Sequence, residues 1–246
     1  MKKSFLLLFL FSLLIIVASC KKDQTTTPPD DTYVPIKPVT STSLAGFGHN
    51  SGIPVGTNWT FPASIKVVGH ILGGNPGKEA YAGDKNYESW LSYFSNQPKT
   101  TWETHGLGVF VNLYMKLHNT SANPTTFIFP AGLVFCNDSS TDSTVLDTAQ
   151  TGVIVVPDTI TIPGGDTLNL CLKSFCTNAS RHAPSYFSIY EPKVVSINDQ
   201  MVRFIAALRG KSTLASHESD ILGYIWKFTG GTPLTEADYA TIASWQ

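Results

Sequence analysis

The sequence predicts a mainly β fold with an α appendage, an antiparallel β-sandwich followed by about three short C-terminal helices. Between Phe61 and Tyr190, apolar residues recur at every second position in several short segments, as in strands with one buried face. Turn-forming residues separate these segments. After Ser196 the apolar residues recur at helical spacing instead.

The clearest strand is predicted over residues 107–117, where every second residue is apolar. Other strands are predicted at residues 65–72, 125–136, 152–156, 159–162 and 167–176. Residues 119–124 are typical of a turn, residues 130–132 of a bend, and residues 163–166 (Pro-Gly-Gly-Asp) of a hairpin. Short strands joined by such turns favour a sandwich with an immunoglobulin-like outline.

Three helices are predicted in the C-terminal part. The first spans residues 196–209 before Gly210, and the second spans residues 218–228 before Gly230. The segment from Thr235 to Asp238 is similar to a capping box, so a third helix is expected to begin there. We therefore expect a β-sandwich domain over residues 44–194 and a helical part over residues 195–246 packed on it. The helices either plug an open end of the sandwich or form a separate functional module.

The N-terminus has the features of an export signal. Lys2 and Lys3 precede an apolar run over residues 5–17, which is shorter than the ~20 residues of a membrane-spanning helix. The following segment, Val-Ala-Ser-Cys at residues 17–20, resembles the lipobox of bacterial lipoproteins. The resemblance implies that a signal peptide over residues 1–19 is removed and that Cys20 carries acyl chains such as palmitate, which anchor the protein in a membrane. The alternative is a retained N-terminal membrane helix.

The residues after Cys20 bear on location. Lys21 and Lys22 stand where an aspartate would keep enterobacterial lipoproteins in the inner membrane. A lysine followed by Asp23 is partly similar to the surface-export signal of Bacteroidota lipoproteins. The resemblance implies an outer-membrane lipoprotein, and either surface display or a simple solvated spacer explains these residues. Residues 20–43 are rich in Thr and Pro and are expected to form an extended tether.

Composition excludes some partners and cofactors. The chain has 17 Lys and Arg against 18 Asp and Glu, a formal net charge of −1, and no basic run, so no nucleic-acid partner is expected. It contains no Gly-rich phosphate loop, and its six histidines are scattered. We therefore expect neither a cofactor nor a metal ion.

Three cysteines remain once Cys20 is acylated. Cys171 and Cys176 lie on one predicted strand, ~16 Å apart, too far for a disulfide. Cys136 and Cys176 each end a strand and precede a polar loop, so these two are the preferred disulfide pair. The alternative is that all three are reduced and buried.

Two further groups of residues are candidates for function. The aromatic side chains between β segments, Tyr87, Trp90, Tyr93 and Trp102, could form a face that stacks on glycan rings or packs on a protein partner. The alternative is an insertion pinned to the sandwich by its aromatics. The polar loop after Cys176 holds Asn178, Arg181 and His182, which could activate a thiol, or could simply bond local backbone.

These observations predict an envelope-anchored lipoprotein that acts as a binding or structural module at the cell surface or in the periplasm. Its expected partners are the membrane, through the lipid anchor, and a glycan or protein ligand. The alternative is a hydrolase acting on envelope or polysaccharide material, and the sequence leaves enzymatic activity undecided, leaning against it.

Overall fold

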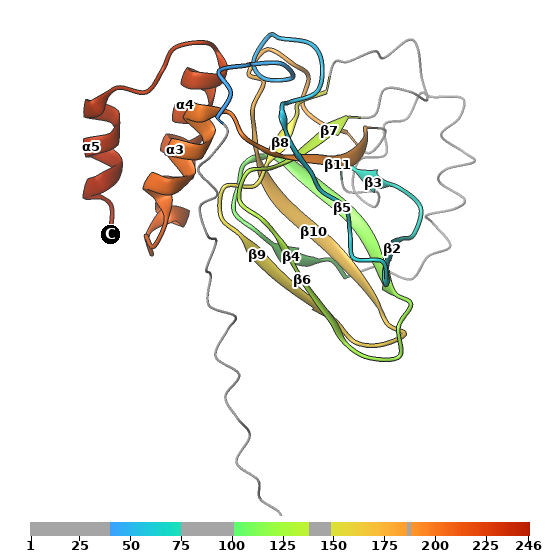
Figure 1. Cartoon of the computed structure of the whole chain (residues 1–246). Coiled ribbons are helices and arrows are strands. Elements are labelled where there is room, and N and C mark those ends of the chain that lie inside the picture. The colour runs from blue at the N-terminus through green and yellow to red at the C-terminus, as the bar shows by residue number, and fades with distance from the viewer. Residues whose placement is uncertain (1–39, 75–100, 138–148, 186–187) are drawn as a thin grey trace, which may run out of the picture. The chain divides into compact units, whose positions relative to one another are not determined.

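The computed structural model describes residues 40–74, 101–137, 149–185 and 188–246, which belong to one compact unit, Val39–Gln246 (Figure 1). The strands are β1 (Gly56–Asn58), β2 (Ile65–Val67), β3 (Ile71–Leu72), β4 (Glu103–His105), β5 (Phe110–Asn119), β6 (Thr125–Phe129), β7 (Leu133–Asn137), β8 (Gly152–Val153), β9 (Asp158–Ile162), β10 (Thr167–Cys176) and β11 (Ile189–Ser196). The helices are α3 (Asp199–Leu208), the 3-10 helix η2 (Leu214–His217), α4 (Glu218–Thr229) and α5 (Glu236–Ser244). The prediction of a mainly β fold with three C-terminal helices is confirmed.

Six strands pair into a closed antiparallel ring. The order is β5, β3, β11, β7, β8 and β10, and β10 pairs again with β5. β2 adds to β5, β4 adds to β10 as a parallel strand, and β1 adds to β11. β6 and β9 form a separate two-stranded sheet. The sequence did not predict that the six strands close into a ring. The predicted division of the strands into two sandwich sheets stays a prediction.

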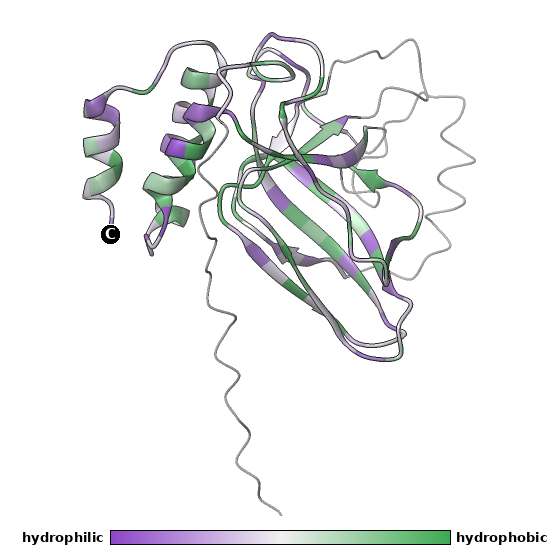
Figure 2. Ribbon diagram, in the orientation of Figure 1, coloured by the Kyte–Doolittle hydropathy of each residue, from purple (hydrophilic) through white to green (hydrophobic). Residues whose placement is uncertain are grey.

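The long ladder between β5 and β10 runs from the pair Thr167↔His118 to the pair Phe175↔Phe110. Hydrophobic and hydrophilic residues alternate along β5, whereas the middle of β10 is a continuous apolar run over residues 170–172 (Figure 2). Val111, Leu113, Met115 and Leu117 are fully buried, and their neighbours on β5 lie on the outer side. The alternation predicted from the sequence is therefore the alternation between the core and the outer face.

The sheet of β6 and β9 continues the ladder of β7 and β8. The last pair of β6 with β9 is Phe129↔Asp158, and the first pair of β7 with β8 is Val134↔Val153. Val134 lies five residues after Phe129, and Val153 lies five residues before Asp158, so both pairs fit the same antiparallel register. The register is therefore preserved through the bend at residues 130–132, which the sequence predicted. The two ladders thus share one register on either side of the bend, where residues 130–132 belong to no strand.

The predicted hairpin at residues 163–166 is wrong. β9 pairs with β6 and β10 pairs with β5, so this turn passes from one strand pair to another. The cause is packing against the turn that follows β5. A Cβ atom on Gly164 would lie 2.2 Å from the carbonyl oxygen of Ala122, so only glycine allows this approach.

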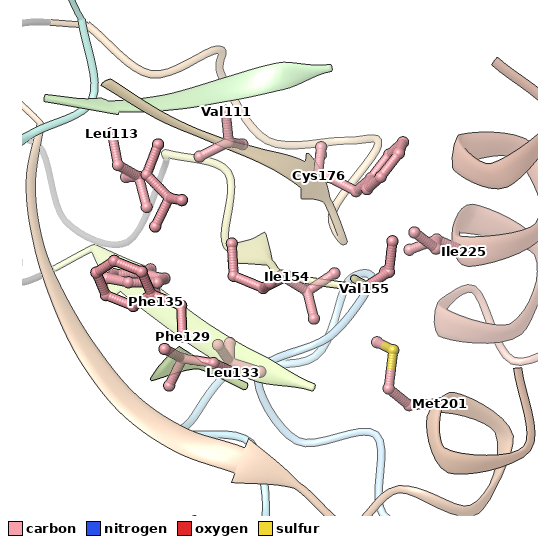
Figure 3. Packing of buried hydrophobic residues seen from close by; sticks show 14 of the residues in the cluster. Val111, Leu113, Phe129, Leu133, Phe135, Ile154, Val155, Cys176, Met201 and Ile225 are labelled. Atoms are coloured by element: carbon pink, nitrogen blue, oxygen red, sulfur yellow. The ribbon is translucent and has the colours of Figure 1, made fainter. Parts of the chain in front are cut away.

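The helices share the core of the ring. Figure 3 shows Val111 and Leu113 of β5 across from Phe129 and Phe135, with helical side chains at one end of the cluster. Buried residues of the helices are Met201, Phe204, Leu208, Ile221, Leu222, Ile225, Phe228 and Ile242. The capping box predicted for α5 is present, since the Thr235 hydroxyl accepts from the Asp238 amide and the Asp238 carboxylate accepts from the Thr235 amide.

The folded unit begins before the predicted start at residue 44. The Ser41 amide donates to the Ile197 carbonyl oxygen at 2.9 Å, and the Asp199 amide donates to the Ser41 carbonyl oxygen at 2.9 Å. The last residues assigned to the tether are therefore held at the start of α3. Among the described helices, none is both long enough and apolar enough to cross a membrane.

Candidate functional site

Several predicted site residues fall outside the described part of the chain. These are the lipidation site and three of the four aromatic residues, namely Cys20, Tyr87, Trp90 and Tyr93. Trp102 is described. Its ring meets the ring of Tyr114 edge to face, with centroids 5.2 Å apart, on the outer side of β5.

The predicted disulfide between Cys136 and Cys176 is absent. β8 lies between the strands that carry them, because Gly152 pairs with Cys176 on one side and with Phe135 on the other. Two strand spacings put the two cysteines ~10 Å apart, beyond the ~7 Å that a disulfide spans. The alternative that the thiols are reduced agrees with this geometry.

The thiol of Cys176 does not meet an activating histidine. Burial raises the pKa of Cys176 above its usual value, and the Asn178 amide that donates to its sulfur at 3.2 Å offsets this only in part. Burial likewise raises the pKa of Cys171. His182 is exposed, and its carbonyl oxygen accepts a hydrogen bond from the Gln150 amide. Protonated, buried thiols are poor nucleophiles.

The polar loop at residues 177–182 holds distant segments of the chain together. Asn178 is fully buried, and its side-chain amide donates to the carbonyl oxygens of Gly46 and Gly48, while its side-chain oxygen accepts from the Thr151 amide at 2.9 Å. Arg181 donates to the carbonyl oxygen of Asn50 at 3.1 Å. The loop is thus structural, but Gly46, Gly48 and Asn50 are distant in sequence and are not the local backbone that the alternative predicted.

A cluster of one histidine and two carboxylates was missed by the sequence analysis. His105 Nδ1 lies 3.2 Å from Asp158 Oδ2, and His105 Nε2 lies 2.6 Å from Glu103 Oε1. Glu103 and His105 are two residues apart on β4 and so share one side of that strand. The Glu-x-His spacing was the one feature of the sequence that could have indicated this pair. Asp158 comes from β9, which no local pattern connects to β4.

The cluster favours a charged histidine. Ionised carboxylates only accept hydrogen bonds, so both ring nitrogens act as donors when each faces one. Partial burial lowers the pKa of His105, but the hydrogen bonds and charges of Glu103 and Asp158 outweigh it and raise the pKa above its usual value. His105 therefore links β4 to β9 as a proton-dependent bridge.

A chemically distinct surface lies on the outer side of β2, β4, β5 and β10. We call it the outer β5–β10 face. It consists of the residues on these strands that alternate with the core positions, together with the outward residues that pair with them on neighbouring strands. Its members are Lys66, Thr104, Phe110, Asn112, Tyr114, Lys116, His118, Thr167, Asn169 and Lys173, together with Cys171 and Phe175, which are buried beneath their neighbours.

Two aromatic pairs occupy this face. Phe110 stacks on Trp226 of α4 with ring centroids 6.0 Å apart and planes inclined by 28°. The second pair is the edge-to-face contact between Tyr114 and Trp102. Along β5 the two pairs are separated by four residues, or ~14 Å. Asn112 and Lys173 lie between them as a cross-strand pair.

Phe110 is held in a strained conformation. Its φ is 74°, which costs a bulky residue about 1–3 kcal/mol, and its side chain remains 56% exposed. The preceding segment is forced close to β10, since a Cβ atom on Gly108 would lie 2.3 Å from the carbonyl carbon of Ser174. Glu218 of α4 accepts a hydrogen bond from the Gly108 amide at 3.2 Å. The fold thus holds an aromatic ring at the surface against its backbone preference.

No protein-family model, curated protein or solved structure matches this chain.

Proposed function

We propose that this chain is an envelope-anchored lipoprotein that acts as a binding module, with the outer β5–β10 face as its ligand surface. The observation that carries the proposal is the exposed and strained Phe110, whose ring stacks on the partly buried ring of Trp226. Backbone strain persists where the surrounding structure over-determines it, and such sites concentrate at ligand-binding positions. Exposed aromatic rings supply flat apolar surfaces on which sugar rings or partner side chains pack.

A second aromatic pair on the same face supports the proposal. Tyr114 and Trp102 lie along β5 from Phe110, with the amide of Asn112 between the two pairs. Aromatic surfaces that alternate with directional polar groups suit an extended ligand better than a small compact one. A linear glycan chain has this form.

The anchor part of the proposal rests on the N-terminal residues. A charged start, an apolar run, small residues and Cys20 occur in the order that lipoprotein processing requires. The lysines after Cys20 favour the outer membrane, and the Thr- and Pro-rich segment after them would space the folded unit from its surface.

The anchor is tested by a substitution at Cys20. Cys20→Ala should prevent acylation and move the protein from the membrane fraction to the soluble or uncleaved fraction, and mass spectrometry of the N-terminal peptide should find acyl chains only with Cys20 present. Protease treatment of intact cells should degrade the protein if it faces outward. An unmodified Cys20 in the mature protein would contradict the anchor.

The binding role is tested on a glycan array that includes neutral and acidic chains. The full-length protein, purified in detergent, should bind at least one glycan class, and Phe110→Ala should weaken that binding about tenfold. Ile128→Ala, which removes an exposed apolar side chain from β6, is the matched control and should leave binding unchanged. Binding that ignores Phe110 would contradict the assignment of the face.

We also propose that the ring is flattened into two layers, so that the fold is an antiparallel sandwich of immunoglobulin-like outline. One layer would hold β2, β5, β10 and β4, and the other would hold β7, β11 and the sheet of β6 and β9. The unbroken register from β6 into β7 supports this division. A crystal structure giving a separation of ~10 Å between two facing layers would bear it out.

A further inference from the structure

The outer β5–β10 face carries positive charge without negative charge. Its charged residues are Lys66, Lys116 and Lys173, and His118 lies beside Lys66 as a cross-strand neighbour. No carboxylate occupies an outward position on the described β2, β4, β5 and β10. The chain as a whole has slightly more acidic than basic residues, so the excess of positive charge on this face does not follow from the overall composition.

The lysines are available to a ligand. None of the ion pairs formed among the described residues includes Lys66, Lys116 or Lys173. Lys66 is exposed, and the other two are partly exposed. A lysine held in place on a strand and not neutralised by a neighbour attracts anions from solution.

Amide groups accompany the lysines. Asn112 pairs across the strands with Lys173, and Asn169 pairs with Lys116. An ammonium group next to an amide offers an ion pair together with a directional donor and acceptor, which matches an anionic group that is surrounded by hydroxyls. Sugars that bear a carboxylate or a sulfate have this combination.

The other side of the molecule lacks this character. The outward residues of β6 and β9 include Thr126, Ile128 and Thr161, and the two threonine hydroxyls bond each other at 2.9 Å. The lysine on β11, Lys193, forms an ion pair with Glu191. Among the strands compared, only the outer β5–β10 face therefore has both lysines without acidic neighbours and stacked aromatic rings.

We propose that the outer β5–β10 face binds an anionic polysaccharide, whose sugar rings stack on the aromatic pairs and whose carboxylate or sulfate groups meet Lys116 and Lys173. The proposal rests on the proposed binding function and names its ligand class. A nucleic acid would also combine anions with stacking rings. However, nucleic-acid sites use dense Lys and Arg, and this face has three lysines, no arginine and wide spacing.

The test is a titration of the full-length protein in detergent with four probes: polygalacturonate, chondroitin sulfate, neutral pullulan and a single-stranded oligonucleotide. We expect binding to at least one acidic glycan that weakens steadily with added salt. The two acidic probes distinguish carboxylate from sulfate recognition. Lys116→Gln with Lys173→Gln should weaken binding at least about tenfold, and Lys193→Gln, on β11, should not.

Three results would overturn the proposal. They are equal binding of pullulan and the acidic glycans, tighter binding of the oligonucleotide, and acidic-glycan binding that survives the double lysine substitution. Thermal melting must show that the variant is folded, and the milder single variants replace it if it is not. Neutral-glycan binding that depends on Phe110 but not on the lysines would remove this inference and leave the proposed function intact. Absence of binding to any probe and any arrayed glycan would remove both.

Discussion

The two ends of the strand pair formed by β5 and β10 are each closed by one fully buried asparagine, and the two work over different ranges of sequence. Asn119 ends β5 and bonds the turn that follows it, with its amide donating to the carbonyl oxygens of Asn123 and Ile162. Asn178 follows β10 and bonds Gly46 and Gly48, about 130 residues earlier in the chain.

The difference teaches how each end is stabilised. The Asn119 side chain also accepts from the amide of Ser121 and the hydroxyl of Thr125, so most of its partners come with the turn itself. The carbonyl groups of Gly46 and Gly48 reach Asn178 only when the start of the folded unit packs against the loop after β10. One end is therefore a reinforced turn, and the other is a junction between distant segments.

The largest expected effect is at the junction. Asn178→Ala leaves the Gly46 and Gly48 carbonyl groups and the Thr151 amide without their partner in a buried site, so we expect a loss of about 3 kcal/mol in the free energy of unfolding. Urea denaturation measures it. Asn169→Ala, at an outward position of β10, is the control and should cost less than about 0.5 kcal/mol. Hydrogen exchange should show lost protection at residues 44–50 but not at residues 119–124.

Asn119→Ala should cost about 2 kcal/mol, less than Asn178→Ala, because several of its partners lie near solvent and water can replace the lost bonds. Hydrogen exchange should now increase at residues 119–125 and 162–166 and stay unchanged at residues 44–50. Equal loss of protection at both ends would contradict the division into a local turn and a long-range junction.

A smaller effect is expected between the two ends, at the bridge from β4 to β9. The pKa of His105 is raised in the folded protein, so its bridge stabilises fully below the unfolded pKa of ~6.5 and is lost as pH rises through the folded pKa. His105→Gln should therefore cost about 1 kcal/mol at pH 5.5 and less at pH 9.

The matched control for this bridge is His118→Gln. His118 Nδ1 contacts the Asp166 carbonyl oxygen and the Thr167 hydroxyl, not a carboxylate. Its substitution therefore removes an imidazole from the same set of strands without breaking a bond to a carboxylate. If urea denaturation shows the same cost for His105→Gln at both pH values, the charged bridge is not what joins β4 to β9.

The smallest effect concerns the strained residue at the helical end. Glycine accepts a φ of 74° without steric strain, and this gain exceeds the entropy that glycine adds to the unfolded chain, so Phe110→Gly should be more stable than Phe110→Ala by about 0.5 kcal/mol, the reverse of the usual order within strands. Both variants lose the ring that stacks on Trp226, so the difference isolates the backbone. Thermal melting of the two variants measures it, and a more stable alanine variant would show that the conformation is not strained.

Sequence patterns predicted the features that local chemistry determines. The alternation in β5, the bend at residues 130–132, the three helices and the capping box at Thr235 each depend on residues a few positions apart. The hairpin at residues 163–166 was mispredicted because a Pro-Gly-Gly-Asp turn specifies a reversal of the chain but not the strand with which the returning segment pairs. That partner is chosen by packing against the turn after β5.

The candidate site was harder to predict for the same reason. Asn178 and Arg181 suggested chemistry because they are close in sequence to Cys176 and His182, yet their bonding partners lie at residues 46–50. The bridge of His105 needs a carboxylate from β9, and the outer β5–β10 face exists only through the register of four strands. Trp102 was singled out as an aromatic, but its contact with Tyr114 depends on β4 and β5 both pairing with β10.

The attachment of Ser41 to the start of α3 has a mechanical consequence. Tension applied along the chain from its N-terminal side first loads the two backbone hydrogen bonds that join Ser41 to Ile197 and Asp199, and then the bond from Asn198 to the Ser43 carbonyl oxygen. Only after these yield does the load reach the contacts of residues 46–50 with the loop after β10. Because Ile197 directly follows β11, a pull from that direction is borne first where this strand of the ring joins α3.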